Sequence, residues 1–258
     1  DVQAGSLNEK DDQRGYAHFL EHMLFNGTEH YPPGTLVEYF QSIGMRFGAD
    51  TNAHTTFDET VYRLLLPDGK RSTLREGLLV MADYARGALL IEDEVERERG
   101  IILAEKRSRD SARYRLFEKK TPFALAGTRA AKRLPIGTEE ALLAANAPKL
   151  RQFYDAWYRP QNSILVVVGD VDVPLAEELI ALQFEGLSAP AGLPECYDFG
   201  RVDEQETRAL HIHEPELGHT EISLSTRWNS VPRNDSFAWQ AELVKRYAVT
   251  SMFNNRLK

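Results

Sequence analysis

Residues 15–28 read GYAHFLEHMLFNGT, and this stretch predicts both a helix and a site for chemistry. His18 and His22 are four positions apart, so on a helix they lie one turn apart on the same face. Two imidazoles placed in this way can reach one metal ion, and the carboxylate of Glu21 can point at a water molecule on that ion. The alternative is a surface helix with two unrelated histidines, but the apolar neighbours of the motif argue against full exposure to solvent.

The composition indicates a folded, acidic protein and excludes several classes. The chain has 258 residues, of which 42 % are hydrophobic, and its formal net charge is −8. This apolar share is too high for general disorder. An acidic chain without a Lys/Arg cluster argues against nucleic acid as the main partner. No apolar run approaches the roughly 20 residues of a membrane span. The single cysteine, Cys196, excludes an internal disulfide and leaves the compartment open.

Apolar periodicity and turn residues predict helices that alternate with extended segments. Capping-box patterns at Thr35 with Glu38 and at Thr73 with Glu76 are expected to begin two of the helices. The interleaving of the two kinds of element predicts mixed α and β structure, with helices packed on one face of a sheet. The expected helices cover residues 13–25, 35–43, 73–90, 93–115, 138–145, 148–157, 174–184 and a stretch that begins near 247.

The extended segments are recognised by β-branched residues, alternation and flanking turns. The apolar run 164–168 predicts a buried strand, and the Gly-, Ala- and Pro-rich stretch 186–194 predicts a linker. The expected strands cover residues 45–57, 60–66, 163–169, 208–213 and 220–226.

The helix expected over 93–115 offers a third metal ligand. Glu98 and Glu105 are seven positions apart, which is nearly two full turns and almost the same direction from the helix axis. Ile101 and Ile102 lie between them on that side, and a carboxylate that faces inward needs a partner such as a metal ion. The alternative is that both acids belong to a charged, solvated helix. The local pattern leaves both interpretations open.

Taken together, the motifs resemble those of the pitrilysin/insulinase family of zinc peptidases, which includes the mitochondrial processing peptidase. The order H-x-x-E-H in residues 18–22 is the inverzincin signature. The resemblance covers about residues 4–172 in the expected order. Its further matches are NAHTTFDETVY at 52–62, ERGIILAE at 98–105, LPIG at 134–137, and WYRP at 157–160 with VVVGD at 166–170.

The resemblance implies a role for each acid and histidine. His18, His22 and Glu105 would bind zinc (Zn2+), and Glu21 would act as the general base. Glu98 would be an assisting acid that orients the ligands.

The resemblance also implies a place for the substrate. Residues 49–57 are similar to the edge strand at which peptide substrates of the family add through main-chain hydrogen bonds. Asn52, Ala53 and Thr55 are therefore the expected substrate contacts. The alternative is an ordinary exposed strand whose polar residues cap a turn.

The fold implied by the resemblance is α+β, with an antiparallel-rich mixed sheet backed by helices. This unit is one half of a clamshell, and in the family it is used twice. Residues 1–190 would be the catalytic domain without its first strand, 191–204 a linker, and 205–258 the truncated beginning of a second, non-catalytic homologous domain. The implied partners are a peptide substrate and a second homologous domain or subunit that completes the clamshell.

We therefore predict a zinc metalloendopeptidase, in the bacterial periplasm or the cytoplasm. Two alternatives remain: a non-catalytic member of the family that binds peptide or serves as a scaffold, and a zinc hydrolase that acts on a non-peptide substrate. The intact H-x-x-E-H set argues against the first, and the strand-like segment 49–57 argues against the second.

Overall fold

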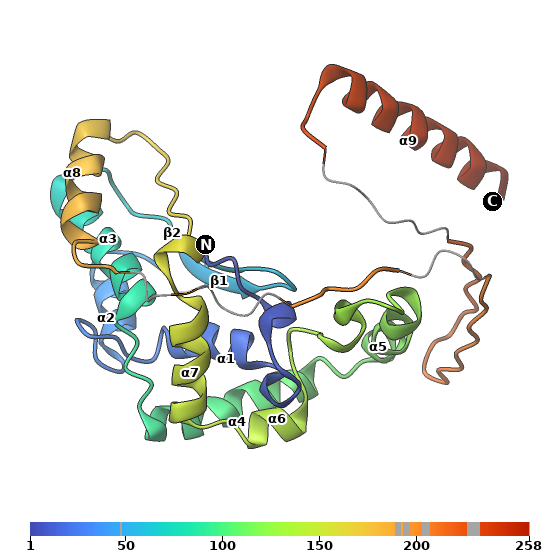
Figure 1. Cartoon of the computed structure of the whole chain (residues 1–258), viewed down its shortest axis with the longest axis horizontal. Helices are drawn as coiled ribbons and strands as arrows, with labels where there is room; N and C mark the ends of the chain where they lie inside the picture. The colour runs from blue at the N-terminus through green and yellow to red at the C-terminus, as the bar shows by residue number, and fades with distance from the viewer. Residues whose placement is uncertain (47, 189–191, 193–196, 203–206, 226–232, 258) are drawn as a thin grey trace. The chain divides into compact units, whose positions relative to one another are not determined.

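The computed structural model describes residues 1–46, 48–188, 192, 197–202, 207–225 and 233–257 (Figure 1). The chain divides into two compact units, Asp1–Ile222 and Ser223–Lys258. The second unit contains one described helix, α9 (Phe237–Leu257). Among the described residues, no helix has both the length and the apolar character that crossing a membrane requires.

The first unit is rich in helices and carries one small sheet. Strands β1 (Thr51–Thr55) and β2 (Thr60–Leu64) form an antiparallel pair in which Thr55 lies opposite Thr60. This arrangement confirms an α+β fold. The helices of the first unit are α1 (Tyr16–Met23), α2 (Thr35–Ser42), α3 (Arg71–Arg86), α4 (Glu92–Ser108), α5 (Ala112–Ala124), α6 (Glu139–Leu143), α7 (Ala147–Trp157) and α8 (Val173–Gln183).

Helix α1 is the centre of the core. It contacts α4, α7 and β1, and seven of its eight residues are buried, including both apolar and acidic side chains. Phe19 and Leu20 are completely buried, as is Met23 one turn later. Phe19 and Met23 share one face of the helix and Leu20 lies about 100° from Phe19, so their burial anchors the H-x-x-E-H motif on two sides.

The N-terminus of α1 is held by a carboxylate from a preceding segment. Glu9 is completely buried, and its two carboxylate oxygens accept hydrogen bonds from the backbone N–H groups of Gly15 and Ala17, each at 2.9 Å. Burial raises the pKa of Glu9 to about 8, against the effect of these two hydrogen bonds. Gly15 has a φ of 103°, and a Cβ there would lie 3.0 Å from the Cα of Gly137. The LPIG motif thus packs directly against the start of α1.

Helix α2 begins at Thr35 as predicted, but both predicted capping boxes and the length of one helix are wrong. The capping box at Thr35 is wrong: Gly34, with a φ of 84°, precedes α2, and the Thr35 hydroxyl donates to the carbonyl of Pro32. Helix α3 begins at Arg71, so Thr73 does not cap it either. The single helix expected over 93–115 is two helices, because Ser111 accepts a hydrogen bond from the backbone N–H of Tyr114 and starts α5.

The buried strand predicted over 163–169 is wrong. Ser163 forms an isolated bridge with Val2, and Ile164 exchanges backbone hydrogen bonds with Asp1. Beyond that point no described strand pairs with the run, and Val168 is 89 % exposed. An apolar run becomes a core strand only when other layers cover it. Here Val167 packs partly buried against a small apolar cluster, whereas Ile164 and Val166 are exposed.

The strands predicted over 208–213 and 220–226 are also absent from the described residues, since 208–213 and 220–225 form no ladder. Ile222 is 94 % exposed. Because these two segments pair with no described strand, their alternating apolar side chains do not form the buried face of a sheet. Residue 226 lies outside the described residues, as do most of the predicted linker 186–194 and parts of the segment 191–204.

Candidate metal centre

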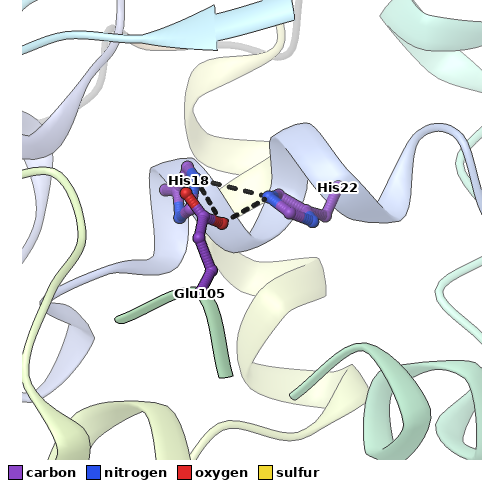
Figure 2. A group of neighbouring side chains, drawn as sticks. All are labelled: His18, His22 and Glu105. Atoms are coloured by element: carbon purple, nitrogen blue, oxygen red, sulfur yellow. Dashed lines mark hydrogen bonds and ion pairs between the residues drawn. The ribbon is translucent and has the colours of Figure 1, made fainter. Parts of the chain in front are cut away.

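Two elements bring three potential metal ligands together (Figure 2). Helix α1 supplies His18 and His22, and α4 supplies Glu105 from far along the chain. The Nε2 atoms of the two imidazoles lie 3.3 Å apart. The Oε2 atom of Glu105 lies 3.6 Å from Nε2 of His18 and 3.5 Å from Nε2 of His22.

The spacing of the three atoms fits a tetrahedral zinc site. Zinc–nitrogen and zinc–oxygen bonds of about 2.0–2.2 Å at tetrahedral angles separate neighbouring ligand atoms by about 3.3–3.5 Å. Two imidazole nitrogens and one carboxylate oxygen are also the donor types that zinc prefers at catalytic sites, where three protein ligands leave a fourth position open. The residues present therefore fit the ion that the sequence predicts.

Glu98 determines which nitrogen of His22 faces the centre. Its Oε1 atom lies 2.7 Å from Nδ1 of His22, and its Oε2 atom accepts a hydrogen bond from the side-chain amide of Asn26 at 2.6 Å. With the Nδ1 proton donated to Glu98, Nε2 of His22 presents its lone pair to the other two ligands. Glu98 is buried, as expected for an acid on the inward face of the helix. Its carboxylate has His22 and Asn26 as hydrogen-bond partners.

The stripe of acids on α4 is only partly buried. Ile102 is completely buried between Glu98 and Glu105, whereas Ile101 is 49 % exposed. Glu105 is half-buried, and its Oε1 atom accepts a hydrogen bond from the guanidinium of Arg109, one turn later. Arg109 therefore leaves Oε2 as the oxygen that faces the histidines.

Burial, hydrogen bonds and neighbouring charges shift the pKa values of the site residues. Burial lowers the pKa of His18 to about 4, and the positive charge of a protonated His22 acts in the same direction. Burial also disfavours protonation of His22, but its hydrogen bond to Glu98 and the charge of that carboxylate outweigh this effect and raise its pKa. Burial raises the pKa of Glu21, against the hydrogen bond from Thr55. A carboxylate with a raised pKa is a stronger base.

A cavity of about 620 Å³ opens over these residues. It is lined by the three ligand candidates, by Glu21 and Glu98, and by one stretch of β1. All three predicted substrate contacts, Asn52, Ala53 and Thr55, lie in this wall. The structure thus brings every predicted site residue to one cavity. The role of each remains a prediction.

Two residues of the site were not predicted from the sequence. Arg109 follows Glu105 by four positions, which is the spacing of a helical ion pair, so this contact could have been recognised. Asn26 gave no such signal, because its partner Glu98 is 72 positions away in the chain.

Comparison with known proteins places the chain in a family. The model of the insulinase family, peptidase family M16, matches residues 1–133, and the model of the M16 inactive domain matches residues 144–245. The chain belongs to the insulinase family (M16).

Relatives of similar sequence are named as zinc proteases. The chain is 38 % identical, over 261 aligned positions and its whole length, to the "Probable zinc protease PqqL" of Escherichia coli, of which it covers 27 %. It is 33 % identical to a "Zinc protease PQQL-like" of Arabidopsis thaliana, with 87 % of this chain and 24 % of that one aligned. The chain therefore spans about a quarter of the length of these M16 relatives.

A solved structure supports the same assignment. The crystal structure of the first half of the periplasmic protease PqqL from Escherichia coli matches 77 % of this chain and 42 % of that chain, with a TM-score of 0.73 and 39 % sequence identity. The structure of pitrilysin, at 23 % identity and a TM-score of 0.62, shares the fold.

We predict that the Glu98→Gln variant of this M16 chain binds zinc about 10- to 100-fold more weakly, because the amide replaces the charged acceptor that orients His22. Zinc affinity is measured by competition with a chelating dye. Glu96→Gln, an exposed acid on the same helix, is the matched control. Equal zinc affinities of the two variants would show that Glu98 has no influence on the metal.

Proposed function

We propose that this chain contributes the catalytic centre of a zinc-dependent endopeptidase, with Glu21 as the general base. The observation that carries the proposal is the position of the Glu21 carboxylate in the same cavity as the ligand set of His18, His22 and Glu105. The names of the M16 relatives support it. Its substrates would be peptides or unfolded segments.

The residues around the cavity have distinct tasks in this reaction. Zinc, when bound, supplies a Lewis acid that lowers the pKa of water and polarises the scissile carbonyl. Glu21 accepts a proton from the attacking water on its carboxylate and then donates it to the leaving amine. Glu98 orients His22, and Arg109 holds the Glu105 carboxylate.

The proposed position of the peptide follows from the sheet. Strand β1 pairs with β2 along one edge, and no described strand pairs with its other edge. An extended peptide can add there through main-chain hydrogen bonds, which would place its backbone beside the cavity. Because these hydrogen bonds involve only the main chain of the substrate, we propose that peptides of varied sequence are accepted. A second homologous domain or subunit would close over the peptide.

The compartment is part of the same proposal. The Escherichia coli relative is named a periplasmic protease. Of the two compartments that the sequence left open, we therefore favour the periplasm.

Metal removal tests the proposed function. We expect the full-length protein to cleave a quenched fluorescent peptide, to lose this activity when a chelator removes its metal, and to regain it with about one equivalent of zinc. Metal content is measured in parallel. A protein that binds zinc and peptide without cleaving it would be the non-catalytic alternative, and cleavage of non-peptide compounds alone would indicate a different hydrolase.

A further inference from the structure

Glu21, the proposed general base, accepts a hydrogen bond from a side chain of strand β1. The Thr55 hydroxyl donates to Oε2 of Glu21 at 2.6 Å. Glu21 lies on α1 and Thr55 is the last residue of β1, so the bond joins two elements that pack against each other. Both residues line the cavity.

This bond restricts the freedom of the carboxylate. The last torsion of a glutamate side chain is broad, so a carboxylate without a fixed partner rotates easily. The χ1 angle of threonine is stiff, because its Cβ is branched. A hydroxyl held in one direction by β1 therefore fixes the plane of the Glu21 carboxylate and leaves Oε1 to exchange protons.

The same bond changes the interpretation of Thr55. Alternation along the strand places Ala53 and Thr55 on one face of β1. The sequence predicted that Thr55 contacts substrate, but its hydroxyl proton is already donated to Glu21. Any contribution of Thr55 to peptide binding then comes from its backbone, which a change of its side chain leaves in place.

We propose that Thr55 is a positioning residue for the general base, an inference that rests on the proposed function. It acts through Glu21, and its effect is on turnover. A substrate contact would act on binding. The two roles are separable, because loss of a binding contact raises KM, whereas loss of base alignment lowers kcat.

The chain offers a matched control on the same strand. Thr51 is the first residue of β1, is completely buried, and its hydroxyl has no hydrogen-bond partner among the described residues. It does not line the cavity. Thr51→Val and Thr55→Val remove the same hydroxyl and retain the same shape, so their difference reports on the bond to Glu21.

The experiment measures peptide hydrolysis by the full-length variants. We expect Thr55→Val to lower kcat about 10- to 100-fold with KM nearly unchanged, less than the loss of the base itself. Thr55→Ser, which retains the hydroxyl, should recover most of the activity, and Thr51→Val should stay within about twofold of the parent. Zinc content and melting temperature are checked for each variant. Thr55→Ala replaces Thr55→Val if the latter does not fold.

An infrared measurement tests the bond without activity. The carboxylate band of Glu21 is isolated by subtracting the spectrum of Glu21→Gln from that of the parent. It should shift in Thr55→Val and remain in place in Thr51→Val, because only the first change removes its hydrogen bond. An unshifted band together with an unchanged kcat would overturn the inference, as would a rise in KM alone.

The failure of this inference differs from that of the proposed function. If Glu21→Gln cleaves peptide normally, the proposed base is wrong and with it the basis for Thr55. If Glu21→Gln is inactive and Thr55→Val behaves like Thr51→Val, only the positioning role is wrong.

Discussion

The Glu21→Gln variant is expected to lose most peptide hydrolysis and to bind zinc as the parent does. The amide keeps the size of the side chain but cannot accept a proton at neutral pH, so we expect kcat to fall by about 10²- to 10⁴-fold, the usual contribution of a general base. Because Glu21 is not among the three ligand candidates, the zinc content should match that of the parent. Turnover of an unstructured quenched peptide and metal analysis of the same sample measure both quantities.

The control for this experiment is Glu38→Gln. Glu38 is an exposed glutamate on α2, so the same change there tests for unspecific effects. Near-normal turnover by Glu21→Gln would exclude Glu21 as the base. Inactivity with loss of zinc would show that Glu21 supports the metal instead of the proton transfer.

His22→Ala is expected to lose the metal. The change removes one of three ligand atoms and leaves the buried carboxylate of Glu98 without its imidazole partner. Zinc affinity should fall by more than about 100-fold, beyond the loss that follows removal of an outer partner. The variant should also melt at a lower temperature, because a buried charge has lost a hydrogen bond.

Zinc content after dialysis against a fixed zinc concentration measures this loss. His54→Ala is the control, since His54 lines the cavity but lies outside the ligand group. Retention of one zinc by His22→Ala at the parent's affinity would mean that the ion is held elsewhere.

The local elements of the site could be predicted because their geometry is internal to one helix. The spacing of His18 and His22 places both on one face of any helix, and the apolar residues between them indicate burial. Helix α1 has both properties. The seven-residue spacing of Glu98 and Glu105 similarly placed two acids on one side of α4, but could not show whether they faced the core or solvent.

The errors have a common physical origin. The run at 163–169 has the composition of a buried strand, yet Val168 is 89 % exposed in the described structure. Thr35 has the sequence of an N-cap, yet Gly34 takes that position. In each case the local residue pattern allows the predicted structure. Contacts with other parts of the chain decide whether that structure forms.

The sequence by itself determined that His18 and His22 share one face of a helix and, through its resemblance to known motifs, the family; the choice of Glu105 as the third ligand came from the resemblance alone. Helical geometry is local, so a few positions suffice to predict it. Only the tertiary structure decided that Glu98 orients His22 through Nδ1 and that Thr55 donates to Glu21. Contacts such as those of Glu98 and Thr55 join segments far apart in the chain, and their geometry depends on the packing of whole elements.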